Sequence, residues 1–198
     1  RGLHVRGNRA WITSTSGLFI FENEQFHPII KDCTSTVMDI IPWEGRLYYP
    51  EKNKIYSISG DHREETPQVV LELPEDILIF RVFLIDSSIW MNTSKEVFIG
   101  NLEHKTLQRE VIGLRNFNSL FKDFTGNIWA SSLLGEGIVK IFGHGLSSFA
   151  LDQHSDYALV WSFCEDPGKN IWISTQQGIL KKEPNKAPTY AEVGPGIK

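Results

Sequence analysis

The sequence predicts an all-β fold of about five four-stranded antiparallel sheets, and three observations lead to this prediction. One phrase recurs five times in 198 residues: a turn, an apolar step around an aromatic, a short polar turn and a second apolar run. The aromatic positions are spaced by 37, 42, 39 and 43 residues, and such a period is typical of stacked β units. No stretch longer than about ten residues has apolar spacing of three and four, so we expect essentially no helix. The five positions that should form the repeated core are Trp11, Tyr48, Trp90, Trp129 and Trp172.

The repeat around Trp129 shows the four strands that we expect in each unit. Its first turn begins at Asp123, which caps the turn locally, and continues to Gly126 and Asn127, which tolerate a positive φ. Apolar runs flank this turn, and further turn signals follow at hairpin spacing. We expect the strands of this unit at residues 118–121, 128–131, 138–142 and 147–151.

The other units follow the same template. Three strands each are expected at residues 37–41, 47–49 and 55–58, at 77–85, 89–91 and 97–99, and at 159–163, 171–174 and 179–181. Together the units form one domain over residues 1–198, with approximate boundaries at 1–36, 37–76, 77–117, 118–157 and 158–198.

The second strand of each unit has apolar residues on both faces. In Ala10-Trp11-Ile12 and Ile171-Trp172-Ile173, neighbours that point to opposite faces are both apolar. Such a strand has to be covered on both sides, and a stack of twisted sheets does this by packing each sheet between two others. The sequence therefore predicts a β-propeller of four-stranded antiparallel blades.

Composition and charge exclude several classes of function. Hydrophobic residues make up 41% of the chain, enough for a core, and a net charge of −4 disfavours nucleic-acid binding. The longest apolar run, residues 77–85, is interrupted by Arg81 and is too short to cross a bilayer, so no membrane contact is expected. Cys33 and Cys164 lie at different phases of the repeat, which predicts two separate buried thiols rather than a disulfide.

The phrase Asp-x-x-Gly-Asn-Ile-Trp, followed by small polar residues and a Gly-apolar step, resembles the short propeller repeats of hybrid two-component sensors in Bacteroides-type bacteria. Residues 123–139 and 166–180 match closely, and residues 11–19 match without the leading Asp. The units at Tyr48 and Trp90 are degenerate, with Tyr48 in place of Trp. The resemblance covers the whole chain in period and about half of it in motif.

This resemblance implies a periplasmic sensing region of a receptor that signals through a histidine kinase and a phosphorelay, and such regions often recognise oligosaccharides. Propellers of this family usually have seven blades, so we expect a five-blade stretch of a larger ring rather than a ring closed at five. The chain opens at Arg1 in mid-pattern, which indicates a piece of a longer protein. An open array would expose apolar blade faces, so the expected protein partners are further blades of the parent chain or a second copy.

No residue pattern indicates catalysis, a metal or a cofactor. The six histidines have no metal-pair spacing, and no cysteine pair accompanies them. Asp123 and Asp166 occupy the same repeat position, so turn capping explains both better than acid–base chemistry. The Asn92-Thr93-Ser94 triplet matches a glycosylation pattern, which we interpret as a chance match.

A ligand of a propeller commonly meets one end of its central channel, where the loops of each second hairpin and the loops between blades gather. Amides, an arginine and an aromatic at such loops suit sugar binding, through paired hydrogen bonds and a stacking face. The positions that we expect at this end are Asn92, Lys95, Arg115, Asn116, Tyr157, Gln176 and Gln177.

The main hypothesis from the sequence is therefore a non-catalytic ligand-binding propeller segment of a two-component receptor. Two alternatives remain open. One is a carbohydrate-active lyase or hydrolase on a five-bladed propeller, which needs convergent carboxylates or histidines near the axis. The other is a structural propeller that binds only proteins.

Overall fold

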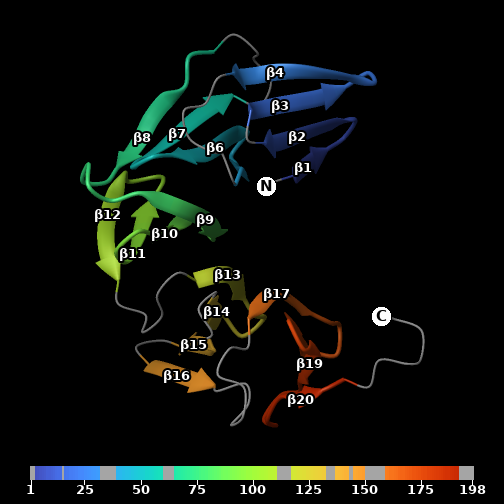
Figure 1. Cartoon of the computed structure of the whole chain (residues 1–198). Helices are drawn as coiled ribbons and strands as arrows, with labels where there is room; N and C mark the ends of the chain where they lie inside the picture. The colour runs from blue at the N-terminus through green and yellow to red at the C-terminus, as the bar shows by residue number, and fades with distance from the viewer. Residues whose placement is uncertain are drawn as a thin grey trace. The chain divides into compact units, whose positions relative to one another are not determined.

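A computed structural model describes residues 3–14, 16–31, 39–59, 65–110, 117–132, 137–142, 145–149 and 159–191 (Figure 1). These residues form twenty strands and contain no helix, as the sequence predicts. The strands pair into five antiparallel sheets of four, and in each sheet they lie in chain order. The chain divides into two compact units, residues 1–110 with three sheets and residues 111–198 with two.

Each sheet uses one stretch of sequence. The first sheet contains β1 (Leu3–Arg6), β2 (Arg9–Ser14), β3 (Gly17–Glu22) and β4 (Gln25–Lys31). The second contains β5 (Ile41–Trp43), β6 (Arg46–Glu51), β7 (Lys54–Ser59) and β8 (Gln68–Glu72). The third contains β9 (Ile79–Ile85), β10 (Ser88–Thr93), β11 (Val97–Asn101) and β12 (Thr106–Glu110). The fourth contains β13 (Phe117–Lys122), β14 (Ile128–Ser132), β15 (Ile138–Phe142) and β16 (Gly145–Phe149), and the fifth contains β17 (Val160–Glu165), β18 (Ile171–Thr175), β19 (Gly178–Lys182) and β20 (Thr189–Tyr190).

The repeated aromatic has the same place in every sheet. It lies in the second strand, two residues after the residue that pairs across the first turn. In the first sheet Arg9 pairs with Arg6, and Trp11 follows two residues later. In the fourth sheet Asn127 pairs with Asp123, and Trp129 follows two residues later. The aromatics of the first four sheets are buried, with at most 7% of their surface exposed. The repeat seen in the sequence is thus a repeat of register in the structure.

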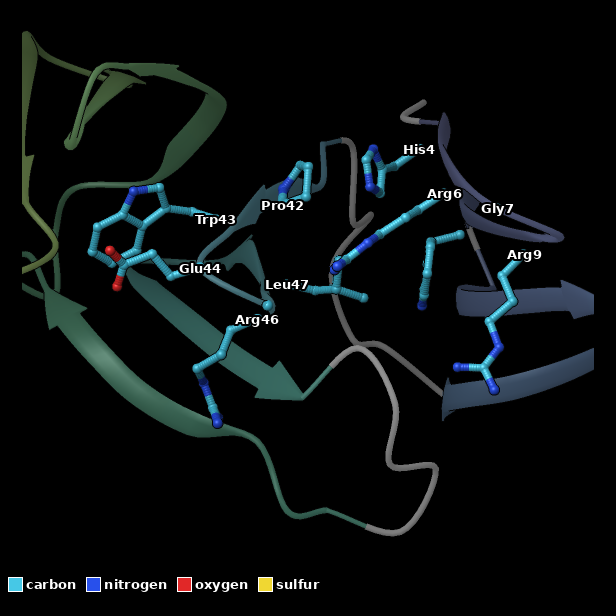
Figure 2. Close-up of a pocket in the computed structure, with 11 residues that line it drawn as sticks. His4, Arg6, Gly7, Arg9, Pro42, Trp43, Glu44, Arg46 and Leu47 are labelled. Carbon is cyan, nitrogen blue, oxygen red and sulfur yellow. The ribbon is translucent and has the colours of Figure 1, made fainter.

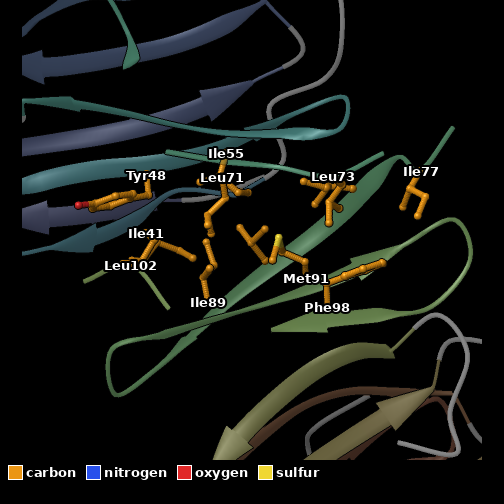
Figure 3. Packing of buried hydrophobic residues seen from close by; sticks show 12 residues of the cluster. Ile41, Tyr48, Ile55, Leu71, Leu73, Ile77, Ile89, Met91, Phe98 and Leu102 are labelled. Atoms are coloured by element: carbon orange, nitrogen blue, oxygen red, sulfur yellow. The ribbon is translucent and has the colours of Figure 1, made fainter. Parts of the chain in front are cut away.

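In the first unit, the aromatics of the first two sheets each face the sheet that follows in the chain. Trp11 of the first sheet packs with Leu47 and Ile58 of the second. Tyr48 of the second sheet lies in a larger cluster with Ile89 of the third. Figure 3 shows this larger cluster, in which side chains of β6, β7 and β8 meet side chains of β10 and β11.

The second unit repeats this packing, but its last aromatic, Trp172, is not fully buried. Trp129 of the fourth sheet packs with Val160, Ile171 and Ile173 of the fifth. Because Ile171 and Ile173 face the fourth sheet, alternation along β18 directs Trp172 to the opposite face. Among the described residues no further sheet follows to cover that face, so Trp172 is half-buried. Lys181 Nζ lies 5.6 Å from its ring centroid.

Polar contacts between neighbouring sheets span one repeat. Asp39, just before β5, accepts hydrogen bonds at Oδ2 from the backbone N–H of Val82 at 3.0 Å and from Arg81 Nε at 3.2 Å. In the second unit, Asn118 Nδ2 donates to the carbonyl oxygen of Val160 at 3.0 Å. Each contact joins residues 42 or 43 positions apart, as expected when successive sheets within one compact unit stack in the same orientation.

Two details differ from the expectations. Cys164 is exposed rather than buried, because it alternates in β17 with Phe163, which packs against the core of the second unit. It is a free thiol, and Cys33 lies outside the described residues. Asn92 and Thr93 belong to β10 instead of a loop.

Gly100 in β11 provides a test of the packing between the second and third sheets. A Cβ at this position would overlap Leu71 Cδ1 and lie 3.1 Å from Ile89 Cγ2. We expect Gly100→Ala to lower the free energy of unfolding by about 1–3 kcal/mol in urea titrations, because the added methyl overpacks a buried contact. Combining it with Leu71→Val should cost less than the sum of the two single changes. Purely additive costs would contradict this contact.

Candidate functional site

A cavity of about 550 Å³ lies in the first unit, where the first turns of the first and second sheets come together. Figure 2 shows that β1, β2 and the turn between them line one side, and β5, β6 and their turn line the other. Its lining includes His4, Arg6, Arg9 and Trp11 from the first sheet, and Trp43, Glu44, Arg46 and Leu47 from the second.

The two hairpin turns that border the cavity are tight, because each contains only two residues and one of the two is a glycine. Gly7 has a φ of 61° in the turn after β1. In the turn after β5, Glu44 and Gly45 have φ values of 46° and 75°. The positive φ at both positions of this second turn is the geometry of a type I′ hairpin, which matches the twist of its strands. The tight turns hold the arginines on either side close to the cavity.

The three arginines of the cavity differ in their partners. Arg9 Nε lies 2.8 Å from Glu22 Oε2. Arg46 pairs with Glu65 at 2.7 Å and donates from Nε to Ser57 Oγ at 3.3 Å. Arg6 is exposed and makes no hydrogen bond or ion pair with any described residue. Arg6 is therefore the cation of this cavity that is not already neutralised by a carboxylate of the described chain.

Aromatic side chains line the same cavity. The rings of His4 and Trp11 stack with centroids 5.5 Å apart and planes 26° apart. Trp43 packs on Tyr48 with a centroid distance of 5.8 Å. Trp11 is only 4% exposed, and its buried Nε1 has no hydrogen-bond acceptor among the described residues. Buried N–H groups in proteins rarely lack an acceptor.

The corresponding indoles of the fourth and fifth sheets do have acceptors. Trp129 Nε1 donates to Asp123 Oδ2 at 2.8 Å, and Trp172 Nε1 donates to Asp166 Oδ2 at 2.8 Å. The second oxygen of each carboxylate closes the turn by accepting the backbone N–H of Asn127 at 2.9 Å and of Asn170 at 3.0 Å. We call this arrangement of Asp, turn and indole the Asp–Trp clasp.

The clasp explains the motif Asp-x-x-Gly-Asn-Ile-Trp residue by residue. Asp and Asn close the turn through hydrogen bonds, and Gly126 adopts the positive φ of 86° that the turn requires. The Trp indole N–H donates a hydrogen bond to the Asp carboxylate. In the fifth sheet Lys169 takes the corresponding place with a φ of 67°. Turn capping therefore accounts for both aspartates, as the sequence analysis expects.

Hydrogen bonds donated to the aspartate carboxylates within the clasps lower the pKa of both groups. Burial alone would raise the pKa of Asp123, but donation from Trp129, Asn127 and Thr125 outweighs it and lowers the pKa from 3.8 to about 2. For Asp166, hydrogen bonds from Asn170 and then Trp172 lower the pKa to about 2. Both groups are carboxylates at neutral pH, so neither has the raised pKa of a general acid.

These lowered pKa values predict an acid-sensitive fold. A carboxyl whose pKa is lower when folded than when unfolded stabilises the protein above the unfolded pKa. This stabilisation should be lost as the pH falls from about 4 to about 2. We expect urea titrations to show a falling free energy of unfolding over that range, and a shallower fall for the double variant Asp123→Asn/Asp166→Asn. Equal slopes for the two proteins would exclude the clasps as the cause.

The residues predicted to bind a ligand lie elsewhere. Lys95 is exposed in the turn between β10 and β11 and pairs with Asp76, and Gln176 and Gln177 are exposed in the turn between β18 and β19. Asn92 is 3% exposed inside β10. The remaining predicted positions, Arg115, Asn116 and Tyr157, lie outside the described residues.

The cavity lies at the first-hairpin turns of the first and second sheets, and antiparallel strands place the second-hairpin turns of these two sheets at their opposite ends. Lys95 belongs to the first unit, whereas Gln176 and Gln177 belong to the second. Sequence reasoning missed the cavity residues. One signal of them was visible: the first repeat lacks the leading Asp of its motif.

Within the described ranges, no three His, Cys, Asp or Glu side chains gather as a metal-binding group. A search of the same residues for a helix long and apolar enough to cross a membrane finds none.

Comparison with known proteins identifies the fold. No protein-family model and no curated protein matches the sequence. Among solved structures, the chain is similar to the extracellular domain of the hybrid two-component system BT3049 from B. thetaiotaomicron, with a TM-score of 0.76 and 18% identity over 96% of this chain and 28% of that one. The corresponding domain of BT4673 from the same organism gives a TM-score of 0.74 and 16% identity over 94% of this chain and 27% of that one.

Enzymes are also among the similar structures. Virginiamycin B lyase from Staphylococcus aureus matches with a TM-score of 0.72 and 12% identity, over 98% of this chain and 70% of the lyase. Identities this low establish the fold alone. The chain is thus an all-β array of five four-stranded propeller blades, and it spans about a quarter of the length of the two-component domains that it matches.

Proposed function

We propose that this chain is a non-catalytic, ligand-binding part of the extracytoplasmic region of a two-component receptor. The observation that supports this function most directly is the similarity to the extracellular domains of two hybrid two-component systems over at least 94% of the chain. The Asp–Trp clasps add to it, because they give a structural reason for the motif by which the sequence resembles the repeats of such sensors.

The ligand that we propose is an oligosaccharide. In the second unit, the exposed amides of Gln176 and Gln177 offer hydrogen bonds to hydroxyl groups. In the first unit, the exposed amine of Lys95, which pairs with Asp76, is a separate donor. Ligand binding would change the packing between blades or between subunits, and the parent protein would relay that change to its kinase.

Apolar side chains on the outer face of the first sheet support contact with further blades or with a second copy of the chain. Leu3 and Val5 of β1 are 67% and 59% exposed. They alternate with His4, which faces the second sheet, so they lie on the opposite face.

The experiment that tests the sensory function is a glycan array probed with the 198-residue chain, followed by calorimetry with each oligosaccharide that binds. We expect binding without turnover, so that the oligosaccharide is recovered unchanged after prolonged incubation. Absence of binding to every glycan would contradict an oligosaccharide sensor and favour a propeller that binds only proteins.

An enzymatic function is the second candidate, because the lyase from S. aureus shares the fold over most of its length. The same incubations separate the two candidates, since cleavage or elimination products released from a bound oligosaccharide would identify an enzyme. We expect none, because the aspartates at the repeated motif already accept the hydrogen bonds of their clasps.

A further inference from the structure

The first sheet has the indole of the Asp–Trp clasp without its carboxylate. Arg6 closes the first turn of this sheet and occupies the place that Asp123 occupies in the fourth sheet. In the fourth sheet the indole N–H of Trp129 points back to that residue. From the equal register of the two sheets we expect the Trp11 indole N–H to point toward Arg6 in the same way, and both residues line the cavity. In the first sheet a cation therefore takes the position at which the fourth and fifth sheets have an anion.

We propose that the cavity between the first two sheets binds a ligand through a carboxylate group, which takes the place of the missing aspartate. One carboxylate oxygen accepts the hydrogen bond from Trp11 Nε1, the buried N–H that lacks an acceptor among the described residues. The other oxygen pairs with the guanidinium of Arg6. Charge-assisted hydrogen bonds of this kind are the strong ones in proteins, and arginine suits a planar carboxylate.

The distribution of charge agrees with an anionic group at this point. Glu22 and Glu65 neutralise Arg9 and Arg46, so these two arginines leave Arg6 as the group that the ligand meets. Figure 2 shows Arg6 extending from β1 into the space between the sheets, whereas Glu44 lies beside Trp43 and away from Arg6. The carboxylate of Glu44 therefore does not occupy the place beside Arg6.

The size and the walls of the cavity suit a sugar acid. Its volume of about 550 Å³ lies within the range of small-molecule sites, ~300–1,000 Å³. The indole of Trp43 gives it an apolar face, and the imidazole of His4 adds a second flat ring. A uronic acid combines an apolar face with a carboxylate. The choice of a sugar rests on the proposed function, whereas the carboxylate rests on Arg6 and Trp11.

The test follows the indole N–H resonances of the six tryptophans by ¹H–¹⁵N NMR of the full chain, with sequential assignment. Sodium glucuronate is the probe, glucose is the neutral control, and sodium chloride controls for ionic strength. We expect glucuronate to move the Trp11 indole proton downfield in a saturable way, and the other two solutes to leave it in place. No saturable movement, or an equal movement with glucose, would overturn the proposal.

Variants locate the site. Arg6→Gln should weaken glucuronate binding by about tenfold or more, because a charged hydrogen-bonded pair is lost. Arg6→Asp should abolish it, since a carboxylate then stands beside the indole. Arg109→Gln removes an exposed arginine from β12 and should leave binding unchanged. If Arg6→Gln binds as tightly as the unchanged chain, the site is wrong.

The outcomes separate this site from the sensory function. Oligosaccharide binding on the array without any response of Trp11 would refute the carboxylate site and leave the proposed function intact. A Trp11 response to glucuronate in a chain that binds no oligosaccharide would support the site and contradict the proposed function.

Discussion

Replacing Trp129 with alanine should lower the free energy of unfolding by about 3–5 kcal/mol. Trp129 is 3% exposed and packs between the fourth and fifth sheets with Ile138, Val160 and Ile173. The substitution removes this contact area and leaves a cavity that a rigid sheet cannot fill. Urea denaturation monitored by circular dichroism measures the loss.

Trp172→Ala is the matched control for this prediction. It removes the same side chain at the same register position, but Trp172 is half-buried and has no described sheet over its outer face. We expect a clearly smaller loss than for Trp129→Ala. Equal losses would mean that packing between successive sheets is not the source of the stability that the aromatic provides.

The second large effect is expected for Asp123→Ala, at about 2–4 kcal/mol of unfolding free energy. Asp123 is 7% exposed, and its carboxylate accepts hydrogen bonds from Trp129 Nε1 at 2.8 Å and from the backbone N–H groups of Thr125 and Asn127 at 3.0 and 2.9 Å. Its removal leaves the indole N–H buried without an acceptor and leaves the turn without its cap.

A double-mutant cycle with Trp129→Phe isolates the hydrogen bond within the clasp. Phenylalanine keeps an aromatic ring but has no N–H, so Asp123→Ala should cost less in that background, by about 0.5–3 kcal/mol. Asp76→Ala is the control, because its exposed carboxylate pairs with Lys95 at the surface and its loss should change stability little. A coupling of zero would remove the Asp–Trp hydrogen bond from the account of stability.

Much of the fold could be predicted from the sequence because the repeat is local. The apolar run Ile128-Trp129-Ala130 and the turn residues Gly126 and Asn127 specify a hairpin without reference to distant contacts. The predicted strand at residues 138–142 coincides with β15 for this reason. The capping role assigned to Asp123 and Asp166 also follows from residues close in the chain.

The candidate site could not be predicted in the same way. The cavity combines Arg6 and Trp11 with Trp43 and Arg46, more than thirty positions away, and its existence depends on how two tight turns meet. For Asn92 the prediction of a ligand-binding loop position was wrong. Its polarity and the nearby turn suggested an exposed loop, whereas its register in β10 buries it. Residue type alone does not tell at which end of a sheet a residue lies, or on which face of a strand its side chain is placed.

Local sequence patterns are enough to specify the all-β class, the five repeats, the absence of helix among the described residues and the register position of each aromatic. These features follow from local patterns of apolar residues and turn residues, which act within about ten positions of chain. Contacts between sheets determine which face of a strand is covered, which arginine of the cavity has no carboxylate partner among the described residues and which indole lacks an acceptor there. Those properties depend on the stacking of one sheet on the next, and stacking joins residues a full repeat apart.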